Sequence, residues 1–550
     1  TAKALEKVFE ISNSAFNKIL KEKSDVRYYV MKDYKGLKKE KVKAFKALAK
    51  KDKNIKGVTF DERYKRYYPY STVGSKVVGF CSTDNTGVWG IESKYNSSLN
   101  GVSGRRYGYF NTDLDLVETV NEPTNGNNIT STIDVNVQGI LERHMNTFQK
   151  NTGSKNMGCI IMNPQNGEIY AMSSYPEYNL NNPRDLSAFY SPEKIDKMSD
   201  KKKTENLNKI WRNYCISDAY EPGSTFKPMT VAACLDEGVT TGSRAYHCDG
   251  YQVINGVRIK CVAYSRGGHG TINICQSLME SCNDVLMQLG ADLGKRKFLQ
   301  YVNEFGFGKK TGIDLPGEAT GGVFTNDTMH AVELATSSFG QGQTVTMIQM
   351  AAAFSSVING GNYYEPHVVK EVKSENGAVL ESNDNALVRR VITENTSKKL
   401  RKYLYKTVEE GTALPAKVAG YQIGGKTGTA EKHPTGRGNY LVSFIGFATK
   451  DNPEVMIYVT IDEPHVADQA HSTYATQFSS EVLKEVLPVL GMYQDSSTKK
   501  ADKTKASDIK LPSTKEAPDG GYSDGTYSVA GDQTDGTDTA NTASPVPSAE

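Results

Sequence analysis

A serine and a lysine three residues apart constrain this 550-residue chain more than any other feature. They lie in the segment Pro222-Gly223-Ser224-Thr225-Phe226-Lys227. The Pro-Gly pair favours a helix start, and side chains three residues apart share one helix face. Serine is a poor nucleophile unless a base takes its proton, so the pair predicts a serine activated by a lysine. Because the chain holds 66 Lys and Arg residues, this spacing alone also arises by chance on a surface helix.

Two further motifs argue against chance. Ser281-Cys282-Asn283 follows downstream, and Lys426-Thr427-Gly428-Thr429 comes later still, after Gly424-Gly425. The order Ser-x-x-Lys, Ser-x-Asn, Lys-Thr-Gly is the set found in serine β-lactamases and penicillin-binding proteins.

The resemblance is most specific to class B penicillin-binding proteins, of a Gram-positive type with a cysteine in the second motif. It covers roughly residues 60 to 490. Besides the three motifs, these segments resemble the family: Arg66-Tyr67-Tyr68-Pro69, Gly79-Phe80 and Gly90-Ile91-Glu92 in the pedestal domain, and Thr132-Ile133-Asp134, Gln138, Glu142, Asn163 to Met172, Trp211-Arg212-Asn213, Phe339-Gly340-Gln341-Gly342 and Gly411-Thr412-Ala413 in the transpeptidase domain.

The resemblance implies an α/β fold, a mixed sheet flanked by helices, in a β-lactamase/transpeptidase-like catalytic domain with an irregular N-terminal pedestal domain. The apolar patterns agree, because strands near the end of the chain and helices in its middle predict a sheet with helices on both faces. We expect strands at 423–429, 441–448 and 454–461, a hairpin around Asn166-Gly167, and helices at 272–293 and 347–358.

Composition divides the chain into four parts. Residues 1–56 are the lysine-rich helical part of the pedestal, 57–128 its β-rich part, 129–492 the transpeptidase domain and 493–550 a polar tail expected to be disordered. The lysine-rich part is either a solvated pair of helices or a surface for anionic lipid or wall polymer. Its apolar stripe is expected to comprise Leu5, Val8, Phe9, Ile11, Phe16, Ile19 and Leu20.

The family pattern implies a role for each motif residue. Ser224 is the nucleophile, Lys227 its base, Ser281 the relay of the proton to the leaving group, and Asn283 the holder of the substrate amide and of Lys227. Lys426 supplies positive charge for the substrate carboxylate, Thr427 and Thr429 bind it, and Gly428 leaves room for the substrate. The backbone N–H groups of Ser224 and Thr429 form the oxyanion hole. Catalysis needs no cofactor.

The resemblance also implies the partners. The substrate is the D-Ala-D-Ala end of a peptidoglycan stem peptide, the acceptor is an amine of a neighbouring stem, and β-lactam antibiotics acylate the serine. A membrane-spanning glycosyltransferase is the implied protein partner. The net charge of +3 gives no reason to expect nucleic acid.

The implied location is the extracytoplasmic face of the bacterial cell membrane, with a single N-terminal anchor. We expect that anchor to be absent from this chain, which begins at Thr1 and holds no run of about 18 apolar residues.

Four of the eight cysteines cluster between residues 248 and 282. Thiolate and imidazole groups at this density suit a structural Zn²⁺, for which we choose Cys248, Cys261, His269 and Cys282 as ligands. Cys275, Asp249 and His247 are substitutes. The alternatives are a disulfide such as Cys248–Cys261 or free thiols. Cys159 and Cys234 lie in apolar runs and are expected in the core.

Three other functions share these motifs. A β-lactamase or β-lactam sensor would need, for turnover, a base that activates water, and none is identified. A D,D-carboxypeptidase would use water in place of the acceptor amine. A non-catalytic scaffold of the cell-wall synthesis complex would not need the catalytic residues that are all present.

Overall fold

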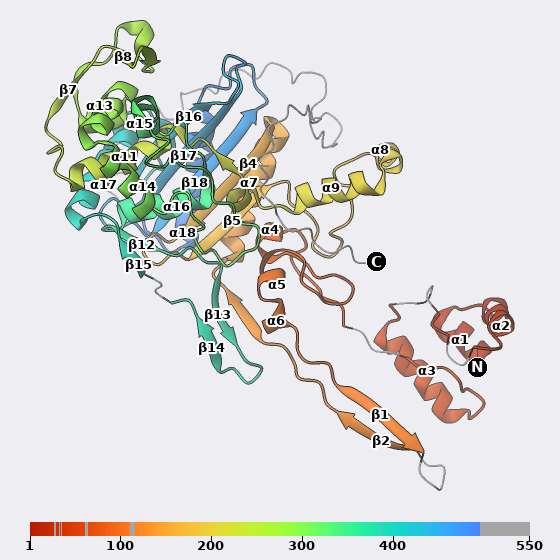
Figure 1. Cartoon of the computed structure of the whole chain (residues 1–550). Coiled ribbons are helices and arrows are strands. Elements are labelled where there is room, and N and C mark those ends of the chain that lie inside the picture. The colour runs from red at the N-terminus through yellow and green to blue at the C-terminus, as the bar shows by residue number, and fades with distance from the viewer. Residues whose placement is uncertain are drawn as a thin grey trace. The chain divides into compact units, whose positions relative to one another are not determined.

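The structure is a computed structural model that describes residues 1–26, 29–31, 34, 36–60, 64–110, 116–384 and 387–494 (Figure 1). The chain divides into two compact units, Thr1–Lys65 and Arg66–Glu550. Nearly all of the tail predicted at 493–550 lies outside the described residues, so its disorder stays a prediction. Among the described helices, none is long and apolar enough to cross a membrane.

The described residues of the first unit form three α-helices where a pair was expected: α1 (Ala2–Phe9), α2 (Asn13–Glu22) and α3 (Lys39–Lys51). Leu5, Phe9 and Phe45 are buried together, with the two rings 5.6 Å apart. Leu20 was wrongly placed in the apolar stripe. It is 55% exposed, on a helix that buries no residue fully.

A five-stranded antiparallel sheet organises the second unit. Its order is β16-β17-β18-β4-β5, so a hairpin from early in the chain pairs with the last strand. The expected strands and the expected hairpin are confirmed: β4 (Ser154–Met162), β5 (Ile169–Tyr175), β16 (Ile423–Glu431), β17 (Tyr440–Ala448) and β18 (Val455–Pro464).

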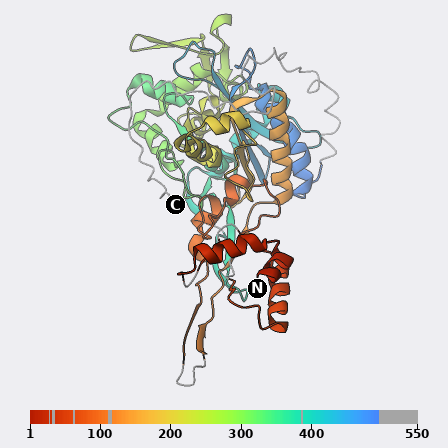
Figure 2. The same cartoon turned by 90° about the vertical axis from the view of Figure 1, so that its right-hand side faces the viewer.

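Both faces of this sheet are buried, which explains the near-continuous apolar runs of its strands. On β4, Cys159 and Ile161 face one cluster, while Ile160 and Met162 face the other. The first cluster is covered by α7 (Val135–Asn151) and α18 (Thr473–Val489), which lie side by side in Figure 2. The mixed α/β fold with helices on both faces is thereby confirmed.

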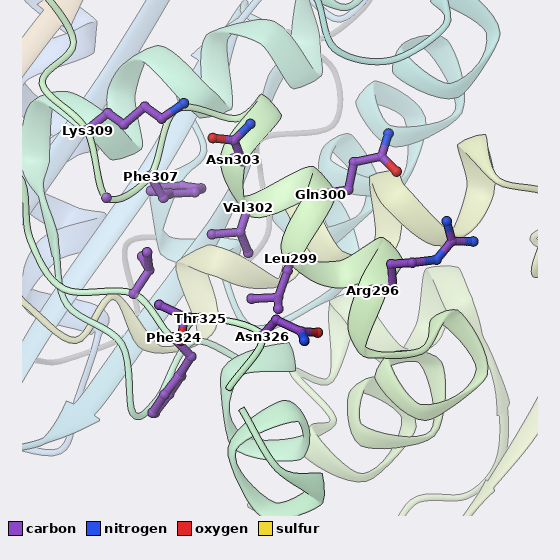
Figure 3. A pocket seen from close by; sticks show the side chains of 12 residues that line it. Arg296, Leu299, Gln300, Val302, Asn303, Phe307, Lys309, Phe324, Thr325 and Asn326 are labelled. Carbon is purple, nitrogen blue, oxygen red and sulfur yellow. The ribbon is translucent and has the colours of Figure 1, made fainter. Parts of the chain in front are cut away.

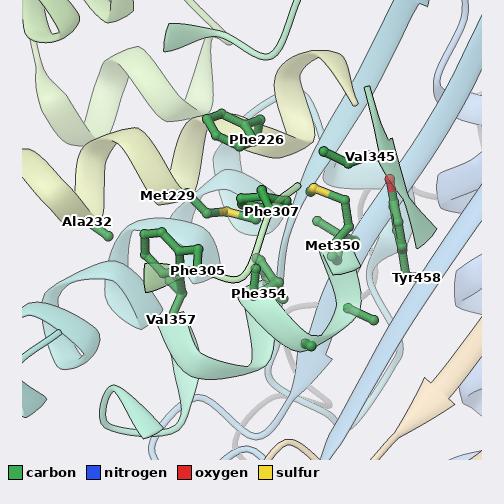
Figure 4. Packing of buried hydrophobic residues seen from close by; sticks show 14 of the residues in the cluster. Phe226, Met229, Ala232, Phe305, Phe307, Val345, Met350, Phe354, Val357 and Tyr458 are labelled. Carbon is green, nitrogen blue, oxygen red and sulfur yellow. The ribbon is translucent and has the colours of Figure 1, made fainter. Parts of the chain in front are cut away.

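The second face packs against α16 (Met347–Ile358), every residue of which is buried, and α11 (Lys227–Asp236) packs in turn against α16. Figure 4 shows this core, in which Phe226, Phe307 and Phe354 lie between the helices and the strand that carries Tyr458. The other described helices that follow β5 are α8 (Pro192–Lys197), α9 (Asp200–Trp211), α10 (Tyr214–Ser217), α12 (Ile274–Met279), α13 (Asn283–Leu293), α14 (Lys295–Glu304), α15 (Ala331–Ser338) and α17 (Glu394–Glu410).

Short helices and strands complete the second unit. The described residues before α7 form the short helices α4 (Ser75–Val78), α5 (Gly90–Lys94) and α6 (Asn96–Leu99). The strands there are β1 (Arg105–Phe110), β2 (Leu116–Asn121) and β3 (Asn128–Ser131). The others are β6 (Ala219–Tyr220), β7 (Ala245–Cys248), β8 (Tyr251–Ile254), β9 (Val257–Lys260), β10 (Gly270–Asn273), β11 (Val345–Thr346), β12 (Asn362–Tyr364), β13 (Val369–Lys373), β14 (Val379–Ser382) and β15 (Leu387–Arg390).

Buried charges join α4 to the sheet and to α7. Glu142 accepts hydrogen bonds from the backbone N–H of Gly74 at 2.7 Å and from Gln138 at 2.8 Å. Glu177 accepts one from Ser173 at 2.6 Å, and Lys76 donates to the carbonyl of Ile210. Burial, reinforced by the charge of Glu177, raises the pKa of Glu142 to about 8, and burial lowers the pKa of Lys76 to about 8.

Candidate active site and cysteine cluster

Ser224 lies on a 3-10 turn (Gly223–Phe226) that leads directly into α11, whose first residue is Lys227. The turn is held by a hydrogen bond from the N–H of Gly223 to the carbonyl of Gly340 at 2.9 Å. It also lies against β16, because a Cβ on Gly223 would come 3.3 Å from the Cβ of Ala430. Lys227 is fully buried, whereas Ser224 is partly exposed and open to a substrate.

The second motif meets this turn. The hydroxyls of Ser281 and Ser224 lie 3.0 Å apart. The Nζ atom of Lys227 donates to the carbonyl of Ser281 at 2.7 Å, to its hydroxyl at 3.2 Å and to the Oδ1 atom of Asn283 at 2.7 Å. Lys227 thus connects to the Ser224 hydroxyl through the hydroxyl of Ser281.

An interruption between two helices directs the Ser281 side chain toward Ser224 and Lys227. The helix predicted at 272–293 is wrong as one element: Ile272 belongs to β10, and α12 and α13 are separate helices. Ser281 has φ 53°, a left-handed conformation that a continuous helix cannot contain. Cys282 then caps α13, with its Sγ atom accepting from the N–H of Val285 at 3.4 Å.

The third motif lies on β16, beside the turn. The Nζ atom of Lys426 donates to the Ser281 hydroxyl at 3.0 Å, so all three motifs converge on one oxygen atom. Thr427 is buried and its hydroxyl lies 3.2 Å from that of Thr412, while Thr429 is exposed. A Cβ on Gly428 would lie 2.3 Å from the Ser443 hydroxyl, so this position excludes any larger residue without rearrangement.

Burial sets the charge state of both lysines. It lowers the pKa of Lys227 to about 8, and it holds the pKa of Lys426 well below its usual value, an effect that the charge of Lys227 reinforces. A lysine with a pKa near neutrality can accept a proton, as a general base must.

One contact at the rim was not anticipated. Glu221 accepts a hydrogen bond from the N–H of Gly342 at 3.1 Å and lies 3.5 Å from the Nε2 atom of His433, on the loop between β16 and β17. Glu221 therefore ties that loop and the Gly340–Gly342 segment to the Ser224 turn. The sequence contains no local signal for these contacts of Glu221, because Gly342 and His433 are both remote from it in sequence.

The structure brings the four chosen metal ligands together. Their ligand atoms all lie within 4.8 Å of one another, and the eight cysteines form no disulfide. The Nδ1 atom of His269 lies 3.4 Å from Cys248 Sγ and 3.7 Å from Cys261 Sγ, which lies 3.7 Å from Cys282 Sγ. The hydrogen-bond contact with the neighbouring Cys282 lowers the pKa of Cys261, which favours a thiolate there.

The substitute ligands are directed elsewhere. His247 and Asp249 pair with each other at 2.9 Å, and Cys275 contacts the sulfur of Met279 at 3.9 Å. Cys159 and Cys234 are fully buried in the core, as predicted.

A hollow of about 420 Å³ lies apart from these residues (Figure 3). Leu299, Val302, Phe307 and Phe324 line its apolar part, and Arg296 and Lys309 lie at its edge. No residue of the three motifs lines it, so it is not assigned to the chemistry.

Comparisons with known proteins agree with this geometry. The penicillin binding protein transpeptidase domain matches residues 157–485, and the penicillin-binding protein dimerisation domain matches residues 1–131. Stage V sporulation protein D of Bacillus subtilis is 36% identical over 503 residues, covering 90% of this chain and 73% of that protein. Peptidoglycan D,D-transpeptidase FtsI of Buchnera aphidicola is 27% identical over 450 residues, covering 80% and 72%.

Solved structures share the fold. Penicillin binding protein 2X from Streptococcus thermophilus superposes with a TM-score of 0.74 at 25% identity, covering 92% of this chain and 75% of that chain. The chain therefore belongs to the penicillin-binding protein family, in its class B. It is a serine-type peptidoglycan D,D-transpeptidase, the class that the motifs predicted.

Proposed function

We propose that Ser224 forms the acyl-enzyme and that Lys227 is its base. The observation that carries this is the chain of contacts from Lys227 Nζ through the Ser281 hydroxyl to the Ser224 hydroxyl, at 3.2 Å and 3.0 Å. Ser224 Oγ attacks the carbonyl carbon of the penultimate D-Ala as its proton passes to Lys227. The C–N bond then breaks, and the proton returns through Ser281 to the amine of the departing D-Ala.

The second half of the reaction resolves the ester. An amine of a neighbouring stem peptide attacks the acyl carbon and gives up a proton to Lys227, which passes it to Ser224 Oγ as the C–O bond breaks, and a crosslink results. The N–H groups of Ser224 and Thr429 stabilise the oxyanion in both halves, which in such sites lowers the barrier by about 3–4 kcal/mol. The approach of the turn to β16 at Ala430 supports this pairing.

The remaining motif residues bind the donor. Lys426, Thr427 and Thr429 receive its terminal carboxylate, since they put a cation and two hydroxyls along β16. Gly428 lets the donor peptide lie flat on the strand. Asn283 holds Lys227 with its Oδ1 atom and the donor amide with its Nδ2 atom.

The test is intact-protein mass spectrometry after treatment with a penicillin. We expect one intact drug mass on Ser224 that persists for many minutes, and no adduct on Ser224→Ala. Rapid loss of the adduct with drug turnover would favour a β-lactamase. Absence of any adduct, with the drug left intact, would favour the scaffold.

We also propose that Cys248, Cys261, His269 and Cys282 hold one structural Zn²⁺. Tetrahedral zinc with Zn–S bonds of about 2.3 Å separates neighbouring ligand atoms by about 3.8 Å. Three of the separations are 3.4–3.7 Å and all lie within 4.8 Å, so the cluster is close to that geometry. The metal would brace Ser281 and Asn283 from behind through Cys282. Native mass spectrometry distinguishes one zinc per chain from a disulfide, which would instead lower the mass by about two daltons.

The assignment of domains and partners follows the family. We propose the boundaries 1–56, 57–128, 129–492 and 493–550, an extracytoplasmic site at the cell membrane, and a membrane-spanning glycosyltransferase partner. Support for the partner comes from the family, since crosslinking needs nascent glycan strands and the matched domains are a transpeptidase domain and a dimerisation domain. Co-purification of such an enzyme with the full-length protein from membranes tests it.

A further inference from the structure

The hairpin of β8 and β9 is a small element that needs an anchor. Two-stranded hairpins are marginally stable by themselves in water. Val253 and Val257 on this hairpin are about half exposed, whereas Ile254 and Ile259 pack partly buried against the core. Polar contacts to α13, the helix that begins with Asn283, add to this attachment.

Asp284 is the centre of that attachment. Its Oδ1 atom accepts from Gln252 of β8 at 2.6 Å and from Gln288 of α13 at 2.8 Å. Gln288 also donates to the carbonyl of His247 on β7 at 2.7 Å. The Asp284 side chain is fully buried, so losing its acceptor would leave two amide donors without this partner.

The adjacent residue connects the hairpin to the chemistry. The Nδ2 atom of Asn283 donates to the carbonyl of Lys260 on β9 at 3.4 Å, while its Oδ1 atom accepts from Lys227 at 2.7 Å. The hairpin therefore fixes which end of this amide faces the lysine. If the hairpin moves away, the Nδ2 atom loses this partner and the amide is free to turn.

We infer that Asp284 is a positioning residue for the transpeptidase reaction. By holding Gln252 and Gln288, it keeps the hairpin on α13 and so keeps the Asn283 amide aimed at Lys227. This inference rests on the proposed roles of Lys227 and Asn283. None of these side chains is a proposed metal ligand, but Cys248 and Cys261 flank the hairpin, so the test must separate the two roles by zinc content.

The test measures acylation by a chromogenic cephalosporin in stopped flow, which separates the rate constant of acylation from the affinity of the first complex. For Asp284→Ala we expect the rate constant to fall about 10- to 100-fold, as for a misplaced catalytic group, with affinity changed less than about threefold. Asp284→Asn keeps an Oδ1 acceptor and should remain within about threefold of the wild type.

Asp292 provides the matched control. It lies on the same helix and pairs with Arg244, just before β7, at 3.1 Å, but at the end remote from Asn283. Asp292→Ala should acylate at the wild-type rate even if its melting temperature falls. Zinc content is measured in every variant. If Asp284→Ala loses zinc and acylates slowly, the slow acylation is explained by the metal site, and the positioning role of Asp284 is overturned.

Two other outcomes would also overturn the inference: wild-type acylation by folded Asp284→Ala, or an equal loss in Asp292→Ala. If Asp284→Ala fails to fold, Gln252→Ala decides, because it removes only the hairpin's side of the contact. Wild-type acylation in that variant would contradict the proposal. Failure of the wild-type protein itself to acylate would instead contradict the proposed function.

Discussion

The Nζ atom of Lys426 lies 3.0 Å from the hydroxyl oxygen of Ser281. Lys227 approaches the same oxygen at 3.2 Å from another direction. Two buried amines that share one hydroxyl cannot both carry a charge without a large cost, since each is desolvated and each repels the other. The site thus favours a state in which one lysine is free to take a proton.

The first prediction is that acylation accelerates as pH rises. Lys227 has a pKa of about 8 and must be neutral to act, so only about a tenth of the enzyme is active at pH 7. The acylation rate constant should rise about tenfold per pH unit below that pKa and level off above it. Stopped-flow rates from pH 6 to 9.5 measure this. Lys227→Arg should be inactive throughout, and a flat profile in the wild type would contradict the role of Lys227.

The second prediction concerns the close approach of β16 at Gly428 to β17 and to the Ser224 turn. Gly428→Ala places a Cβ 2.3 Å from the Ser443 hydroxyl and 3.0 Å from the Cγ2 atom of Thr225, so the strand or the Ser224 turn must shift. We expect acylation to slow by about tenfold or more. Adding Ser443→Ala removes the worse clash and should restore part of the rate.

Ser443→Ala alone is the control for that double variant, and it should stay within about threefold of the wild type. If the double variant is as slow as Gly428→Ala, then the Thr225 contact or the donor itself sets the requirement for glycine.

The third prediction follows from the proposed zinc site. Removal of that zinc, verified by mass, should lower the melting temperature and slow acylation by about tenfold or more, because Cys282 separates Ser281 from Asn283. Cys282→Ser should behave in the same way. Cys275→Ser, which lies outside the cluster, should bind zinc and acylate normally. An apo protein with an unchanged melting temperature and acylation rate would refute a bracing role.

The fourth prediction concerns the buried carboxylate below α4. Glu142 has a folded-state pKa raised to about 8, so the folded state holds its proton at pH values where the unfolded chain has lost it. Its contribution is complete below the unfolded pKa and is lost as pH rises to about 8, by on the order of 2–4 kcal/mol. Lys76 acts in the opposite sense, but only above pH 8, where its lowered pKa lies.

Glu142→Gln mimics the protonated form and should flatten the dependence of the unfolding free energy on pH between 5 and 8. Denaturant unfolding at each pH measures this. Glu205→Gln, on the surface of α9, should keep the wild-type slope. An unchanged slope in Glu142→Gln would mean that Glu142 is already ionised at pH 5.

Much of the site was predictable because each motif carries its own local geometry. Ser224 and Lys227 share one turn, and Lys426 to Thr429 alternate along one strand, so spacing alone orders their side chains. The strands of the central sheet could be predicted equally well, because burial of both faces of the sheet leaves uninterrupted apolar runs in the sequence.

The failures share one physical cause, which is that the deciding partners are remote in sequence. The periodicity from Ile272 to Leu293 continues through Ser281, yet contacts to Ser224 and Lys426 favour a left-handed residue there. The contact of Gln252 with Asp284 joins a hairpin to a helix that no pattern links.

The strand order of the central sheet has a consequence for how the protein is made. Met162 on β4 pairs with Met456 on β18, so about 300 residues of chain must be synthesised after the first hairpin before it gains its neighbour. Until then the apolar edge of β4 has nothing to pair with and is open to unwanted association. The nascent chain should therefore depend on a holding chaperone, and ribosome-bound fragments that end before β18 should bind no penicillin.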